Sequence, residues 1–200
     1  MNEPKKFGSG QGIMHRVAGK EAKFSTTKSK SELMATITDL VKTISDDRLR
    51  DSLSRFIENG AFKGAPSSPS YHHAYENGNL EHTVEVLSSA IVMASMVDDA
   101  IHVDRDVLIA GAILHDIGKE DCYEMNEDGI VETETSNMNG HVVRGIQIAA
   151  QSIESEKIDT IIHVIASHHA TMEWGSPVHP ETPEAWIVHL ADSLSARLLG

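Results

Sequence analysis

The chain has 200 residues, of which 17 are Lys or Arg and 30 are Asp or Glu, so its formal net charge is −13 at pH 7. This length suits one domain with a substantial core and is too short for two large ones. The acidic balance argues against a broad electropositive surface that holds duplex nucleic acid by its phosphates, so a polyanionic substrate must be bound locally.

The single cysteine, Cys122, argues against an internal disulfide framework and is typical of a reducing cytoplasm. We interpret it as a passive thiol. No apolar run approaches the length needed to span a bilayer, and the N-terminal sequence lacks the apolar region of a signal peptide. We therefore expect a cytoplasmic protein that does not associate with membranes.

The first part of the chain differs in composition from the rest. Residues 1–30 are rich in Gly, Ser, Thr and Lys, with only scattered apolar residues, and bury too little surface to offset chain entropy. We expect a flexible N-terminal tail over residues 1–30 and one catalytic domain over residues 31–200.

Apolar residues recur at helical spacing in most of residues 31–200. They predict helices over about 31–44, 49–59, 80–96, 104–115, 140–152, 155–169 and 183–199. The Gly- and Pro-containing stretch 64–69 predicts a loop that leads to His72 and His73. Asp128 and Gly129 lie between short mixed runs and predict a small hairpin or irregular excursion over the site. The fold class is therefore all-α, with this one excursion.

Seven residues of metal-ligating type occur in five separate segments. They are His82, His115, Asp116, His141, His168, His169 and Asp192. Imidazole and carboxylate groups bind divalent first-row metals without thiolate, and seven of them exceed what one ion needs. A buried core rarely tolerates so many polar groups unless something satisfies them. The sequence therefore predicts two divalent metal ions, with Mn, Fe, Ni, Co and Zn all left open.

His115 and Asp116 are adjacent, so their side chains diverge by about 100° on a regular helix. This arrangement suits a site in which one residue binds one ion while its neighbour bridges both. Two ions about 3.5–4 Å apart lower the pKa of a shared water and clamp the oxygens of a phosphoryl displacement. The chain has no P-loop and no nucleophile-elbow motif, so it offers little support for covalent serine chemistry.

Four further predictions concern the catalytic and substrate-binding residues. Asp116 and Lys119 are the candidate catalytic residues, because Lys119 lies one turn further on and is placed to neutralise a phosphate oxygen. A solvated lysine at a helix end is the alternative. His72 and His73 either bind substrate or pack the loop that carries them. Trp174 either stacks on a base, a contact worth roughly 1–3 kcal/mol, or belongs to the core.

The order of these motifs resembles a known superfamily. This superfamily is that of the HD-domain metal-dependent phosphohydrolases. Their motifs are similar to Leu80–Thr83, His115–Lys119, Gly140–Gly145, Ser167–His169 and His189–Asp192. Within that superfamily, three stretches resemble the HD domain of the YhaM-type 3′-to-5′ exoribonucleases. These stretches are Tyr71–Tyr75, Glu81–Thr83 and Glu173–Pro177.

The resemblance implies an HD-domain helical bundle and a role for each ligand. Asp116 is expected to bridge the two ions. The first ion is then completed by His82, His115 and Asp192, and the second by His141, His168 and His169. Two departures limit the substrate inference. Residues 1–60 lack the pattern of the RNA-binding OB-fold found in YhaM-type proteins, and Gly175–Pro177 differs from the Gly-Tyr-Pro of the HD-GYP phosphodiesterases.

Three functions stay open at this point. The favoured one is a two-metal phosphodiesterase that hydrolyses phosphate esters of single-stranded nucleic acid or short oligonucleotides through a metal-bound hydroxide. The alternative enzyme is a nucleotide or cyclic-nucleotide phosphohydrolase. The third function is a non-catalytic, metal-stabilised interaction module, which the intact ligand set disfavours.

Overall fold

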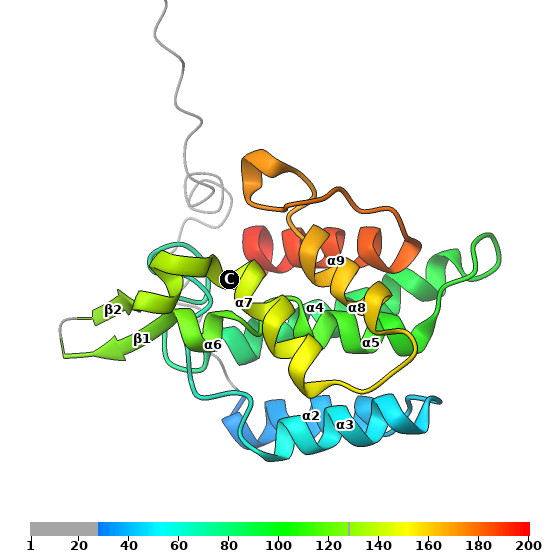
Figure 1. The fold of residues 1–200 in the computed structure, drawn as a ribbon, viewed down its shortest axis with the longest axis horizontal. Helices are drawn as coiled ribbons and strands as arrows, with labels where there is room; N and C mark the ends of the chain where they lie inside the picture. Colours follow the sequence, from blue (N-terminus) through cyan, green and yellow to red (C-terminus); the bar gives the residue numbers. More distant parts are fainter. Residues whose placement is uncertain (1–27, 128) are drawn as a thin grey trace, which may run out of the picture.

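The computed structural model describes residues 28–127 and 129–200. The predicted flexible tail falls almost wholly on residues 1–27, which lie outside the described residues. The helices are α2 (Lys30–Val41), α3 (Asp47–Glu58), α4 (Gly78–Val97), α5 (Arg105–Leu114), α6 (Lys119–Cys122), α7 (Glu134–Ser152), α8 (Ile158–Ser167) and α9 (Pro183–Leu194). A 3₁₀ turn, η1 (Met172–Trp174), and a π-helical turn, η2 (Ser195–Leu199), complete the helical part (Figure 1). The prediction of an all-α fold is confirmed.

Polar residues fix where several helices begin. Ser29 and Glu32 form a capping box at the start of α2, in which each side chain accepts from the other residue's backbone N–H. Asp46 caps α3, Asp104 caps α5 and Thr182 caps α9, each accepting a hydrogen bond from the first turn. These caps satisfy N–H groups that no helical carbonyl reaches.

Helices α4, α5, α8 and α9 pack around the hydrophobic core, and α2 and α3 lie side by side along one flank of it (Figure 1). The core includes Leu80 and Leu87 of α4, Ile113 of α5 and Ile161 of α8, all fully buried. Each such side chain contributes about 1.5–3 kcal/mol through removal of apolar surface from water. This packing brings together the parts of the four helices that carry predicted ligands.

Helix α4 contradicts the expectation that no apolar run approaches the length needed to span a bilayer. By length and composition it is long and apolar enough to cross a membrane, with 20 residues and a mean hydropathy of 1.3 over its best window. In the structure it packs against α2, α5 and α9, and it carries His82 in the core. A central helix of a packed domain meets the same criteria, so this feature by itself does not indicate a membrane span.

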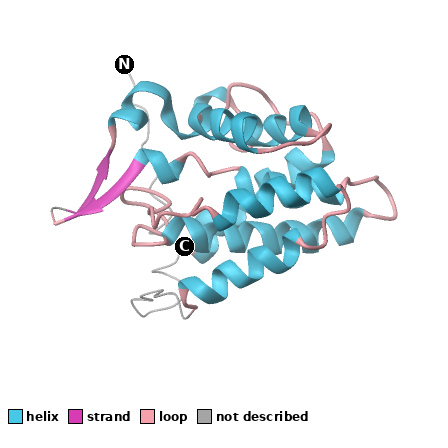
Figure 2. Ribbon diagram, turned by 60° about the horizontal axis from the view of Figure 1, so that its bottom comes forward, coloured by secondary structure: helices cyan, strands magenta, loops and turns pink. Residues whose placement is uncertain are grey.

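The predicted excursion is an antiparallel hairpin of β1 (Tyr123–Asn126) and β2 (Gly129–Glu132), which projects from the helical body (Figure 2). Two helix boundaries differ from prediction. Helix α7 begins at Glu134, before the expected start near residue 140, and is broken at Gly140, whose φ is 69°. Helix α9 ends at Leu194 and continues as the π-helical turn η2, where the sequence predicts a helix to residue 199.

Candidate metal centre

Asp116 lies at the centre of the predicted ligands. Helix α5 ends at Leu114, His115 is its C-cap, and both His115 and Asp116 are buried. Asp116 Oδ1 lies 3.4 Å from His168 Nε2 and 3.6 Å from His141 Nε2. Its other oxygen, Oδ2, lies 3.3 Å from His82 Nε2 and 3.4 Å from His115 Nε2. The two carboxylate oxygens therefore face two separate groups of histidines.

The first ligand group joins three helices. It contains His82 from α4, His115 and Asp116 after α5, and Asp192 from α9, and one ligand atom of each lies within 4.8 Å of the others. His82 Nε2 is 3.1 Å from Asp192 Oδ1. These are the residues that the resemblance assigns to the first ion.

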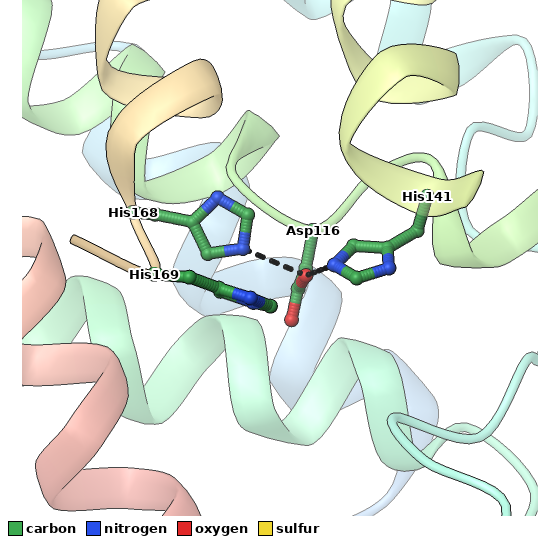
Figure 3. Close-up of side chains that lie close together, drawn as sticks. All are labelled: Asp116, His141, His168 and His169. Atoms are coloured by element: carbon green, nitrogen blue, oxygen red, sulfur yellow. Dashed lines mark ion pairs between the residues drawn. The ribbon is translucent and has the colours of Figure 1, made fainter. Parts of the chain in front are cut away.

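The second ligand group is formed by Asp116, His141 of α7, and His168 and His169 at the end of α8 (Figure 3). Their ligand atoms also lie within 4.8 Å of one another. Figure 3 shows the His141 and His168 rings approaching Asp116 from different helices. The structure thus brings all seven predicted ligands together, in the two groups expected, with Asp116 in both.

Hydrogen bonds from Nδ1 to backbone carbonyl oxygens orient three of the five ligand histidines. His115 Nδ1 is 2.8 Å from the Ala112 carbonyl oxygen, and His168 Nδ1 is 2.7 Å from that of Ile165. His169 Nδ1 is 2.6 Å from the Trp174 carbonyl oxygen. A carbonyl only accepts, so each Nδ1 carries a proton, and the neutral form of each ring presents its lone pair at Nε2. Such lone pairs are the form of histidine that binds metals.

Three buried atoms at the centre have no hydrogen-bond partner within the described part of the chain. They are Asp116 Oδ1, His141 Nε2 and His168 Nε2. A buried polar group without a partner costs about 1–3 kcal/mol. A divalent cation satisfies a carboxylate oxygen and two imidazole lone pairs at once, so the donor set fits the predicted metal ions.

The carboxyl group of Asp116 stays ionised despite its burial. Burial alone raises its pKa, but the positive charge of Lys119 and the charge and hydrogen bond of His115 together hold the pKa well below its usual range. Lys119 Nζ lies 2.5 Å from Asp116 Oδ2. The negative charge that attracts a cation is therefore present at neutral pH.

The pKa of His82 shifts in the opposite direction from those of His115, His141 and His169. Burial lowers the pKa of His141 well below its ordinary value and that of His169 to about 4, so both rings are neutral at pH 7. Burial also opposes the charged form of His82, but hydrogen bonds to Asp116 and Asp192 outweigh it and raise the pKa. An ion that binds at His82 therefore displaces a proton, and its affinity falls in acid.

A cavity of about 460 Å³ opens onto the two groups and is lined by His141, His169 and Asp192. Lys119, His72 and Trp174 also line it, whereas His73 is not among its described lining residues. Lys119 is buried, and its Nζ lies 3.4 Å from Ser67 Oγ as well as beside Asp116. Trp174 is 57% exposed, so the alternative that this residue belongs to the core is wrong.

Other cavity residues were not predicted from the sequence. Tyr123 and Glu132 pair across the base of the hairpin, and Arg197 lies in η2. Buried Glu120 accepts hydrogen bonds from the backbone N–H groups of residues 63–65 and from Asn79, so it holds the loop before His72. No local pattern marks Glu120, because its partners at residues 63–65 and Asn79 are distant in the sequence.

Two glycines place His141 against Asp116. A Cβ at Gly118 would lie 2.0 Å from the His141 carbonyl oxygen and 2.6 Å from Gly145 N, so only glycine permits this close approach of backbones. Gly140 breaks α7 directly before His141 with a positive φ. Both features set the direction from which the second ligand group approaches.

Comparisons with known proteins identify the family of this chain. The family model described as HD domain matches residues 79–197. The chain is 31% identical over 179 residues to a dihydroneopterin 2′,3′-cyclic phosphate phosphodiesterase of Methanocaldococcus jannaschii, covering 82% of this chain and 70% of that protein. It is 34% identical over 180 residues to the 3′-5′ exoribonuclease YhaM of Bacillus subtilis, covering 84% and 55%.

A third relative, the 3′-5′ exoribonuclease YhaM of Bacillus pumilus, is 37% identical over 143 residues, covering 68% of this chain and 44% of that protein. The chain thus spans about half the length of these exoribonucleases. No solved structure gives a significant match. The extent of the HD match and the identity to these relatives lead to one conclusion: the chain belongs to the HD-domain family of metal-dependent phosphohydrolases.

Proposed function

We propose that this chain is a two-metal phosphodiesterase that hydrolyses phosphate esters of single-stranded nucleic acid or short oligonucleotides. One observation carries the two-metal part. Oδ1 of Asp116 faces His141 and His168, while Oδ2 faces His82 and His115, at 3.3–3.6 Å. A carboxylate whose two oxygens serve different ligand groups is the bridge that a pair of ions requires.

A pair of divalent ions supplies a nucleophile from water at neutral pH and neutralises charge on the phosphate. Mn, Fe, Ni, Co and Zn are the candidates, because the ligands are imidazole and carboxylate. The chain contributes the geometry. Asp116 fixes the spacing of the two ligand groups, and the hydrogen bonds through Nδ1 fix the histidine rings before substrate arrives.

Lys119 and His72 bring two different groups to the cavity. The ammonium group of Lys119 balances the charge of Asp116 and lies where it can also pair with a non-bridging phosphate oxygen. Burial, reinforced by the positive charges of His82 and Lys119, lowers the pKa of His72 to about 3. His72 is therefore a neutral ring at the cavity wall and hydrogen-bonds to substrate without adding charge.

The substrate class follows from the size and edge of the cavity. A volume of about 460 Å³ admits a group the size of one nucleotide and excludes a double helix. Trp174 presents an exposed ring at the rim, and stacking on a base is worth roughly 1–3 kcal/mol. The net charge of −13 offers no long phosphate track. These features support single strands that enter by one end.

A nucleotide or cyclic-nucleotide phosphohydrolase is the second candidate. The similarity to the archaeal cyclic-phosphate phosphodiesterase favours it, because this chain covers 70% of that protein and only 55% of the B. subtilis exoribonuclease. A cavity for one nucleotide suits this activity equally well.

A substrate panel with each candidate metal separates the two enzymes. The proposal predicts that single-stranded oligonucleotides are shortened from an end while duplexes resist. Activity confined to mononucleotides or 2′,3′-cyclic phosphates would support the second candidate. An absence of hydrolysis with every metal would leave only a binding role for the site.

Trp174→Ala tests base recognition, with Trp186→Ala as its matched control. Both rings are exposed and contact His189, but Trp186 is absent from the described lining of the cavity. We expect Trp174→Ala to raise KM for oligonucleotides about 5- to 150-fold, the equivalent of one lost stacking contact, with little change for bis-p-nitrophenyl phosphate. Trp186→Ala should change neither. Equal losses on both substrates for Trp174→Ala would contradict a base-stacking role.

A further inference from the structure

His82 is oriented differently from the other ligand histidines. His115, His168 and His169 direct Nδ1 at backbone carbonyls, which can only accept a proton. His82 Nδ1 instead lies 2.8 Å from the hydroxyl oxygen of Ser195. A hydroxyl both donates and accepts, so by itself this contact leaves the tautomer of His82 undefined.

Glu85 removes that ambiguity. Ser195 Oγ lies 2.6 Å from Glu85 Oε2, and a carboxylate has no proton to give. The single hydroxyl proton of Ser195 is therefore donated to Glu85. Ser195 must then accept from His82 Nδ1–H, so that an ion which displaces the proton of Nε2 meets the lone pair of that nitrogen, between Asp116 and Asp192.

The backbone places all three groups for this contact. Glu85 follows His82 by one turn of α4, so both side chains lie on the same face of the helix. Ser195 is fully buried and begins the π-helical turn η2, which the bond from Gly200 N to the Ser195 carbonyl oxygen closes at 3.0 Å. Single π-helical turns are frequent at functional sites.

His73 contacts the same carboxylate oxygen of Glu85 that Ser195 contacts. Its Nε2 lies 3.2 Å from Glu85 Oε2, and its side chain is almost fully buried. His73 has a φ of 46°, which is uncommon for a residue with a side chain, and its Nδ1 lies 3.2 Å from His72 Nδ1. His72 faces the cavity, whereas His73 faces Glu85.

We propose that Ser195 and Glu85 are positioning residues that fix His82 with Nε2 toward the first ligand group, and that His73 supports Glu85 without contacting substrate. The proposal rests on the proposed metal site. It assigns roles to two residues that are not ligands and that lie about a hundred positions apart in the chain.

The first experiment measures metal affinity by competition with a chelator. Wild-type protein should release two ions in two steps. In Ser195→Ala one step should weaken about 10- to 100-fold, the usual cost of losing a residue that orients a ligand, and the other should stay unchanged. Ser195→Thr keeps the hydroxyl and should restore most of the affinity. Glu85→Gln, which removes the charge but keeps an acceptor oxygen, should weaken the same step by about 10-fold or less.

Ser52→Ala is the matched control. Ser52 is a buried serine of α3 whose hydroxyl bonds the Leu49 carbonyl oxygen, far along the chain from the ligands. Ser52→Ala should lower the thermal stability of metal-free protein and leave both steps of metal release unchanged. Loss of folding in Ser195→Ala would show as a lower melting temperature without metal, and Glu85→Gln then carries the test.

A double variant separates positioning from a general structural effect. If Ser195 acts only through His82, adding Ser195→Ala to His82→Ala should not weaken metal binding further. Additive losses would overturn the proposal, as would two unchanged steps in Ser195→Ala. Wild-type protein that binds no ion would instead refute the proposed metal site itself, so the two failures are distinguishable.

Discussion

Two buried aspartates at opposite ends of helix α5 are surrounded in opposite ways. At the N-terminal end, Asp106 accepts from Ser45 N at 2.8 Å, Asp46 N at 3.1 Å and Lys157 Nζ at 3.1 Å. Beyond the C-terminal end, Asp116 has one oxygen without a hydrogen-bond partner among the described residues and faces histidine lone pairs.

The helix dipole sharpens this contrast, because it favours a negative charge at the N-terminus and opposes one at the C-terminus. Asp106 is therefore a satisfied carboxylate that stabilises the fold. Asp116 pairs with Lys119 through Oδ2, but its Oδ1 has no hydrogen-bond partner among the described residues. The comparison teaches that burial alone does not identify a functional carboxylate, whereas unsatisfied burial beside neutral histidines does.

Replacing Asp116 should have the largest effect on function. Asp116→Ala removes the proposed bridge, so turnover of a phosphodiester substrate should fall by more than about 100-fold, beyond the usual loss for a residue that only orients a ligand. Steady-state kinetics with saturating metal measures this, and thermal unfolding without metal checks the fold. Full turnover in Asp116→Ala would contradict the site assignment.

Replacing Asp106 should reduce stability and leave activity unchanged. Asp106→Asn removes the charge that Lys157 and two backbone N–H groups contact, so the free energy of unfolding should fall by about 2–3 kcal/mol. Metal content and turnover should stay at wild-type levels. Urea unfolding with and without chelator measures the change. A loss of activity without a loss of stability would break the comparison.

Lys119→Ala should reduce activity less than Asp116→Ala does and more than Asp106→Asn does. It removes a positive charge beside the phosphate but no ligand, so we expect kcat/KM to drop about 10- to 100-fold while two ions stay bound. Lys119→Arg, which keeps the charge, is the control and should lose less. Unchanged kinetics in Lys119→Ala would identify this residue as a structural partner of Asp116.

The pH dependence of stability gives the smallest effect. Burial opposes ionisation of Asp106, but hydrogen bonds from Ser45, Lys157 and Asp46 outweigh it and lower its pKa. Its stabilisation is therefore fully present above its unfolded-state pKa of about 3.9 and is lost as the pH falls through the lower folded-state pKa. Unfolding of metal-free protein below about pH 4 should show a shallower loss of stability in Asp106→Asn than in wild type. Parallel curves would contradict this account.

The sequence predicts those parts of the structure that depend on local patterns. Helical spacing places α4 and α5, and Asp128 with Gly129 marks the hairpin. Ligand chemistry together with the family motif order selects all seven residues of the two groups, because each motif carries its ligand within a few residues.

Contacts between distant segments could not be predicted. Ser195 meets His82 across 113 positions, and the close approach at Gly118 depends on the path of α7. The apolar pattern of α9 continues through Leu198 and Leu199, so it hides the π-helical turn that places Ser195. His72 and His73 form one motif in the sequence, which does not show that His72 lines the cavity while His73 contacts Glu85.

Elemental analysis after reconstitution with Mn²⁺ or Fe²⁺ tests the bridging role of Asp116 most directly. Wild-type protein and Asp106→Asn should each hold two ions per chain, whereas Asp116→Ala should hold fewer, because both ligand groups lose their shared carboxylate. A wild-type content of one ion or less, or two ions retained in Asp116→Ala, would contradict the account.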